Sequence, residues 1–229
     1  MGHLLLAGGA EFGGRMADPD RRALELAGGL DAPVRIIPTA AAPDNNHIRA
    51  GNNGVRWFQG LGARDVRSLA LTDRASADDT EIIEALRGAK LIYLLGGFTD
   101  YLAKTLKHTR AWEAALEAHA HGAVLAGSSA GAMVLCQYYY DPGAGRVNDG
   151  LGLVANTCVL PHHNKFGKGW ASRLLSDLPG VTLLGIDEQV GAIDDGDGQT
   201  WSVFGQGAVT IYRDGKVKSY QAGETFSIP

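Results

Sequence analysis

The sequence predicts an α/β protein with a doubly wound, mostly parallel sheet that carries helices on both faces. Short apolar runs such as Leu4–Ala7 and Leu91–Leu95 have the length and unbroken hydrophobicity of buried parallel strands. Amphipathic segments separate these runs, and glycine pairs follow several of them, as in tight turns between strand and helix. In a sheet of this kind, ligands bind beyond the carboxyl ends of the strands.

The first half of the chain alternates strand and helix. Pro19 at a helix start and Gly28 at its end delimit a helix over Pro19–Ala27. The acidic end of Ser76–Asp79 resembles a helix cap before an amphipathic segment. The expected strands are Leu4–Ala7, Val34–Ile37, Val66–Leu71, Leu91–Leu95 and Ala123–Ala126, and the other helices lie around Ile48–Leu61, Ile82–Leu86, Tyr101–Leu106 and Trp112–His119.

The second half has a different pattern. Tyr138–Gly150 is polar and rich in glycine, which favours a loop, whereas Thr157–Leu160 and Val181–Ile186 are apolar enough for strands. The final forty residues alternate β-rich runs with glycine turns, which predicts hairpins that close an edge of the sheet. No stretch resembles a linker, so we expect one domain over residues 1–229.

Charge and composition narrow the partners. The 229 residues carry a net charge of −4, so there is no basic surface of the kind that binds nucleic acid. No apolar run approaches the ~20 residues that span a bilayer, so we expect a cytoplasmic protein with no membrane partner. The net charge fits a small peptide substrate better than nucleic acid. The protein partner that we consider is a second copy of the chain, in a homodimer.

The sequence also gives no indication of a cofactor or metal. Cys136 and Cys158 lack the spacing of metal ligands, and we expect them to be small buried side chains. Gly8-Gly9 follows the first strand, but the spacing of a dinucleotide-binding loop and the lysine of a P-loop are missing. We therefore predict that the protein uses neither a cofactor nor a metal.

The most informative stretch is Gly127-Ser128-Ser129-Ala130-Gly131, which lies between two apolar runs. It has the Gly-x-Ser-x-Gly spacing of a nucleophile elbow, in which small residues allow a sharp strand-to-helix turn. The turn would expose the hydroxyl of Ser129 at a helix N-terminus, where unpaired N–H groups favour negative charge. The N–H of Ala130 would form half of an oxyanion hole.

An activated serine needs a base and an acid that orients it. Of the seven histidines, only His162 and His163 follow a strand; the others lie near the N-terminus, in a polar loop or beside helices. The acid could come from Asp141 or Asp149, or from Asp187 or Glu188. The later pair is the better choice, because it follows a strand that would hold it in place.

These motifs together resemble the cyanophycinase and aspartyl dipeptidase (dipeptidase E) family of serine peptidases. The resemblance implies a flavodoxin-like fold of the class I glutamine amidotransferase type. It also implies Ser129 as nucleophile, His162 as base and Glu188 as acid, with a backbone N–H near Gly97 completing the oxyanion hole. The landmarks are Gly8-Gly9-Ala10-Glu11, Gly96-Gly97 with Thr99 and Leu102, Gly127–Ala132, Pro161-His162 and Gly185–Glu188.

Departures from the family pattern concern specificity. Phe98-Thr99 stands where relatives have Asp-Gln or Asn-Thr, and Thr99 would still face the substrate. His163 replaces a usual phenylalanine, and Phe166-Gly167-Lys168 stands where cyanophycinases tend to have Arg-Gly-Arg.

By resemblance, the protein is a serine peptidase that cleaves a peptide or isopeptide bond, as an exopeptidase or dipeptidase with a preference for acidic residues. Lys165 and Lys168, next to His162, are the candidates for holding a substrate carboxylate. The alternatives are an esterase, or a binding protein of the same fold without turnover.

Overall fold

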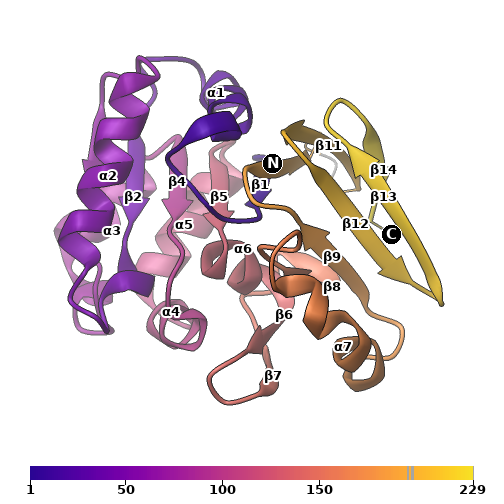
Figure 1. The fold of residues 1–229 in the computed structure, drawn as a ribbon. Coiled ribbons are helices and arrows are strands. Elements are labelled where there is room, and N and C mark those ends of the chain that lie inside the picture. Colours follow the sequence, from indigo (N-terminus) through magenta and orange to yellow (C-terminus); the bar gives the residue numbers. More distant parts are fainter. Residues whose placement is uncertain (195, 197–198, 229) are drawn as a thin grey trace.

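The computed structural model describes residues 1–194, 196 and 199–228, and its strands form two sheets. Figure 1 shows the larger sheet beside the smaller one. The larger sheet has the strand order β14-β11-β10-β1-β5-β4-β2-β3. Its strands are β1 (Leu4–Ala7), β2 (Val34–Ile37), β3 (Val66–Ser68), β4 (Leu91–Leu94), β5 (Val124–Ser128), β10 (Val190–Asp194), β11 (Thr200–Gly205) and β14 (Thr225–Ser227).

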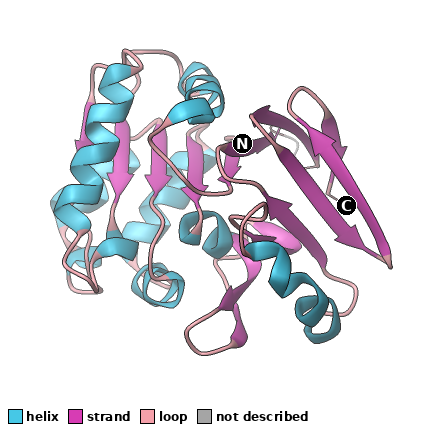
Figure 2. Cartoon of the chain, viewed as in Figure 1, coloured by secondary structure: helices cyan, strands magenta, loops and turns pink. Residues whose placement is uncertain are grey.

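Strands β1 to β5 pair in parallel, and β10, β11 and β14 extend the sheet in antiparallel fashion. Helices cover both faces, as Figure 2 shows. Side chains along β1 alternate between two cores, because Leu4 and Leu6 belong to one and Leu5 to the other. The α/β fold class and its parallel sheet are therefore as the sequence predicts.

The helices lie between the strands, with few changes from the predicted bounds. Asp79 caps α3 by accepting hydrogen bonds from the N–H groups of Glu81 and Ile82, as the capping signal indicates. The α-helices are α1 (Ala17–Leu26), α2 (His47–Gly60), α3 (Thr80–Arg87), α4 (Thr99–Leu106), α5 (Arg110–Ala120), α6 (Ala130–Leu135) and α7 (Ala171–Asp177). Short 3-10 turns are η1 (Gly14–Met16), η2 (Thr39–Ala41), η3 (Ser76–Asp78) and η4 (Gly167–Trp170).

The smaller sheet has the order β13-β12-β9-β8-β6-β7. Its strands are β6 (Cys136–Asp141), β7 (Arg146–Asp149), β8 (Val154–Leu160), β9 (Thr182–Ile186), β12 (Ala208–Arg213) and β13 (Lys216–Gln221). The expected loop over Tyr138–Gly150 is wrong, because β6 and β7 pair there as an antiparallel hairpin. The expected C-terminal hairpins are present, and β12 and β13 form one of them.

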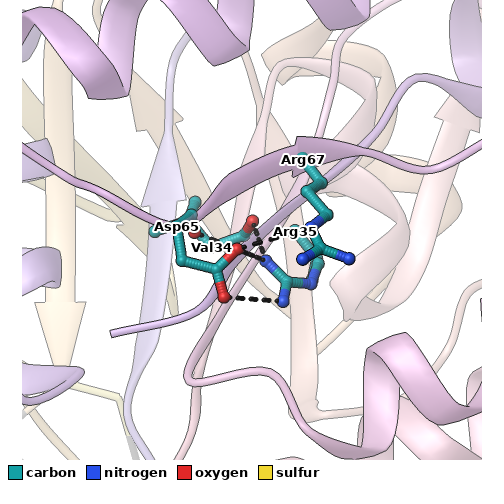
Figure 3. Close-up of polar contacts among 4 residues, drawn as sticks. All are labelled: Val34, Arg35, Asp65 and Arg67. Carbon is teal, nitrogen blue, oxygen red and sulfur yellow. Dashed lines mark hydrogen bonds and ion pairs between the residues drawn. The ribbon is translucent and has the colours of Figure 1, made fainter. Parts of the chain in front are cut away.

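An ion pair at the amino ends of β2 and β3 stabilises the fold. Arg35 on β2 is buried and makes two hydrogen bonds to the carboxylate of Asp65, at 2.9 and 3.0 Å (Figure 3). The hydrogen bonds from Arg35 lower the pKa of Asp65. This ion pair joins β2 to the start of β3. It lies at the amino ends of the strands, whereas the motifs described in the sequence follow their carboxyl ends.

Candidate active site

Ser129 lies at the turn between β5 and α6, in a backbone conformation that few residues adopt. Its φ is 50° and its ψ is −111°, so the elbow holds a strained residue. A side chain on Gly127 would collide with the backbone of Gly131, and one on Gly131 would collide with the carbonyl of Leu94. The two glycines of the motif are therefore required by the sharp turn.

His162 lies between Ser129 and Glu188. The hydroxyl Oγ of Ser129 is 3.0 Å from Nε2 of His162, and Oε1 of Glu188 is 2.8 Å from Nδ1 of the same ring. Because a carboxylate only accepts hydrogen bonds, Nδ1 carries the proton and Nε2 is left to accept from the serine. The structure thus brings Ser129, His162 and Glu188 together, and their catalytic roles stay predictions.

The two sheets hold this constellation together. His162 follows β8 of the smaller sheet, and its N–H donates to the carbonyl of Gly8 after β1, at 2.6 Å. A side chain on Gly9 would collide with the His162 ring, so the glycine makes room for it. Glu188 lies between β9 and β10, and its N–H donates to Oδ1 of Asn164 at 3.0 Å. The loops after β8 and β9 are thereby joined.

The remaining acids of the sequence analysis lie elsewhere. Asp141 ends β6 and accepts a hydrogen bond from the N–H of Gly143, and Asp149 ends β7. Asp187 points to the neighbouring histidine instead, with its Oδ1 3.4 Å from Nδ1 of His163. Of the four candidates, only Glu188 meets His162.

His163 and Asp187 form a second pair on the buried side of the same loops. Nε2 of His163 is 2.8 Å from the hydroxyl of Tyr212, and Oδ2 of Asp187 accepts from the N–H of Ala208 at 3.0 Å. Burial lowers the pKa of His163, and burial together with the charge of Asp187 raises the pKa of Tyr212. This pair links the site to β12.

Of the two expected oxyanion groups, Ala130 directly follows Ser129, and Gly97 directly follows Gly96, which lies beside the serine. Ala130 is the first residue of α6, so its N–H has no partner within the helix. Gly96 lies against the serine, since a Cβ there would be 3.2 Å from Cβ of Ser129. Gly97 has a φ of 139°, and a side chain on it would collide with the carbonyl of Ala40. The roles of Ala130 and Gly97 stay predictions.

Glu11 also belongs to the site, although the sequence alone did not indicate a role for it. Its carboxylate accepts from the hydroxyl of Ser128 at 2.9 Å and from the N–H of Gly96 at 3.3 Å. It thus joins the loop after β1 to the elbow and to the glycine turn. The only sequence signal was its place in the first of the landmark motifs.

The residues that we expect to contact the substrate differ in their exposure to solvent. Phe98 is half exposed at the start of α4, whereas Thr99 is buried, with its hydroxyl 3.7 Å from the sulfur of Met133. Lys165 and Lys168 are exposed on the loop after His162. The substrate roles of these four residues stay predictions.

Two hollows lie on either side of the Gly96-Gly97 turn. The larger, of about 680 Å³, has Gly97, Glu11 and Arg56 in its wall, together with Asn46, Asn53 and Trp57. Beneath Trp57 lies the buried Asp20, which accepts from its indole N–H at 2.8 Å and whose pKa burial raises to about 7. The smaller hollow, of about 620 Å³, has Phe98, Thr99 and Lys104 in its wall.

No helix among the described residues is long and apolar enough to cross a membrane. The cysteines behave as expected, because Cys136 and Cys158 are both buried and unpaired.

Comparison with known proteins gives matches to a family of peptidases. Residues 4–198 match the family model of peptidase family S51. A cyanophycinase of Geminocystis herdmanii (strain PCC 6308) is 30% identical over 228 residues, covering 95% of this chain and 82% of that protein. A cyanophycinase of Trichormus variabilis (strain ATCC 29413 / PCC 7937) is 29% identical over 220 residues, covering 91% and 72%.

Solved structures share the fold. A peptidase from an acI-B1 actinobacterium has a TM-score of 0.89 and 33% identity, over 100% of this chain and 97% of that one. A protein of Listeria monocytogenes EGD-e assigned to peptidase E has a TM-score of 0.61 and 23% identity, over 97% of this chain and 100% of that one. At that identity, the second likeness concerns the fold alone.

Proposed function

The chain belongs to peptidase family S51 and is a serine-type peptidase, and from this premise we propose that it hydrolyses a peptide or isopeptide bond with Ser129, His162 and Glu188. The observation that carries the proposal is the continuous contact from Oγ of Ser129 through the His162 ring to Glu188, at 3.0 and 2.8 Å. The strained turn at Ser129 supports the same assignment, because it presents the hydroxyl beyond the strand end.

The reaction proceeds through an acyl-enzyme. Oγ of Ser129 attacks the carbonyl carbon while Nε2 of His162 accepts its proton, and Glu188 stabilises the imidazolium that forms. The N–H groups of Ala130 and Gly97 stabilise the oxyanion. His162 then gives the proton to the leaving nitrogen as the C–N bond breaks. Water, deprotonated by the same histidine, hydrolyses the ester and restores Ser129.

We further propose that residues 1–229 act as a single hydrolytic domain. Ser129 follows a strand of the larger sheet, His162 follows a strand of the smaller one, and Glu188 lies on the connection between the two. Separating the sheets would therefore separate the triad.

The finer substrate proposal is an exopeptidase or dipeptidase that takes an acidic residue on the acyl side. The hollow beside Gly97 offers the guanidinium of Arg56 and the amide of Asn46 to a substrate carboxylate. Arg56 also donates to Oδ1 of Asn53, and the carboxylates of Glu11 and Asp44 in the same wall oppose a second negative charge. Lys165 and Lys168 are the competing cations. Steady-state kinetics with Asp-Leu distinguish the three cations. The variants to compare are Arg56→Gln, Lys165→Gln and Lys168→Gln. The variant that lacks the residue binding the substrate carboxylate should raise KM most.

Ser129→Ala tests the proposed nucleophile, with Ser176→Ala, at an exposed serine of α7, as the control. A fluorophosphonate probe should label the wild type and Ser176→Ala at Ser129 and leave Ser129→Ala unlabelled. Ser129→Ala should also lose peptide hydrolysis by about 10⁴-fold or more. Hydrolysis at the wild-type rate in Ser129→Ala would refute the assignment.

The same preparation tests the two alternatives. An esterase would turn over short-chain esters and leave Asp-X dipeptides intact. A binding protein without turnover would hydrolyse neither.

A further inference from the structure

Phe166 covers one face of the proposed base. Its ring centroid is 4.9 Å from that of His162, with an angle of 24° between the rings, so the two rings are stacked. The N–H of Phe166 donates to the carbonyl of His162 at 3.0 Å, which fixes the residue one turn after the histidine. On its far side, Phe166 contacts Trp170 at 5.5 Å between centroids.

Phe166 nevertheless remains open to solvent, with 53% of the residue exposed. A large apolar side chain that is half exposed beside a reactive group is a common feature of binding surfaces, because substrate can cover the remaining area. Trp170 and, behind it, Tyr140 support the ring from below at 5.5 and 5.1 Å between neighbouring centroids. Phe166 is thus one of three aromatic rings that pack against one another in a row.

The chemistry of the reaction brings the leaving group to this surface. When the C–N bond breaks, Nε2 of His162 must donate its proton to the leaving nitrogen, which requires a distance of about 3 Å. The residue that carries this nitrogen therefore lies at the edge of the imidazole. With a ring stacked on that imidazole at 4.9 Å, the side chain of the leaving residue is within reach of Phe166.

We propose that Phe166 is the apolar wall of the leaving-group subsite, so that the enzyme favours an apolar residue on the carboxyl side of the bond it cleaves. This inference rests on the proposed function and names the substrate class on one side of the same site. In the step concerned, the Ser129 Oγ–C bond forms and the C–N bond breaks. The serine proton, held on Nε2 of His162, leaves with a neutral amine.

Two substrates with a common acyl group test the proposal. Asp-Leu and Asp-Gly give the same acyl-enzyme, so any difference between them arises before the amine departs. We expect the wild type to have a kcat/KM about 10-fold or more higher for Asp-Leu, by analogy with apolar pockets that discriminate side chains. Phe166→Ala should reduce this ratio to about 2 or less, and Phe166→Leu should give an intermediate ratio.

Control measurements distinguish a role of Phe166 in the leaving-group subsite from a role in supporting the His162 ring. Loss of support would lower kcat/KM for both dipeptides by the same factor and leave the ratio unchanged, which would overturn the proposal. A wild-type ratio near one would also overturn it. Leu175→Ala removes an apolar side chain of α7 that is 39% exposed, and it should leave both the ratio and the rates as they are.

Failure of this inference is distinguishable from failure of the proposed function. Labelling of Ser129 by a fluorophosphonate depends on the triad and requires no leaving residue of the substrate. If the label appears and the Leu-to-Gly ratio does not respond to Phe166→Ala, the triad stands and the subsite is wrong. If the label is absent from both wild type and variant, the proposed function itself fails.

Discussion

The loops after β8 and β9 carry two histidine–carboxylate pairs, one on each side. His162 with Glu188 is partly exposed, with side chains 20% and 28% accessible, whereas His163 with Asp187 is buried, at 8% and 16%. The two histidines are consecutive in the sequence, and so are the two carboxylates. In each pair, Nδ1 of the histidine faces a carboxylate, so the pairs differ in what Nε2 meets.

The hydroxyl that each Nε2 meets decides what the pair can do. On the exposed side it is Ser129 on a strained elbow, and on the buried side it is Tyr212 of β12. Burial raises the pKa of Tyr212, so the phenol keeps its proton and serves as a structural hydrogen-bond partner. A histidine–acid pair therefore becomes a reactive site through the nucleophile that its Nε2 faces.

His162→Ala should give the largest effect on the exposed side. Removal of the base leaves Ser129 without a proton acceptor, and we expect kcat to fall by about 10⁴-fold or more. The free energy of unfolding should change by about 1 kcal/mol or less, because the ring is partly exposed. Steady-state kinetics and urea unfolding measure the two quantities.

His121→Ala is the matched control for this change, since His121 is an exposed histidine at the end of α5. It should leave kcat unaltered. Comparable losses in the two variants would mean that the exposed pair has no special role.

Glu188→Gln should follow, with a loss in kcat of about 10³- to 10⁴-fold. An amide can donate to Nδ1, which favours the imidazole tautomer that cannot accept the proton of Ser129. Asp187→Asn is the same chemical change one residue earlier, on the buried side. If the comparison holds, it should cost stability and reduce kcat far less; a larger loss of kcat than in Glu188→Gln would reverse the two roles.

Much of this fold follows from the sequence. The strands Leu4–Ala7 and Val34–Ile37 have the predicted bounds. The first is a continuous apolar run, as is typical of a buried parallel strand, and the second is apolar except for Arg35, whose charge is paired with Asp65. The hairpin of β6 and β7 was missed because Asp141, Arg146 and Asn148 give no such run. Those strands form through pairing between neighbours, which local hydrophobicity does not encode.

The site was predictable where sterics leave one choice. Gly127 and Gly131 indicate the elbow because a side chain at either position would collide with backbone, so the spacing singles out Ser129 as a candidate. Glu188 and Asp187 are adjacent in the sequence, and only the fold shows that Glu188 is the one that faces His162. Glu11 was missed because its partner Ser128 is 117 residues away.

His163→Phe should show the smaller effects of the buried side. The change places a phenylalanine beside the Tyr212 phenol and the Asp187 carboxylate, and both groups lose their partner. Leaving such groups unpaired costs about 1 to 3 kcal/mol of unfolding free energy, with a loss in kcat of less than about 10-fold. Adding Tyr212→Phe should recover part of that cost, so the double variant would be more stable than the sum of the single changes suggests. Strict additivity would show that the contact contributes nothing.

The pH dependence of stability gives the finest test of the buried pair. Because burial lowers the pKa of His163 in the folded state, the unfolded chain binds a proton more readily than the native protein below about pH 6.5. The contribution of the neutral histidine is therefore complete above that pH and is lost as the pH falls through it. Urea unfolding between pH 8 and pH 5 should show the stability advantage of the wild type over His163→Phe shrinking toward acid. An advantage that grows toward acid would mean that the ion pair with Asp187 outweighs burial and that the histidine is charged in the native protein.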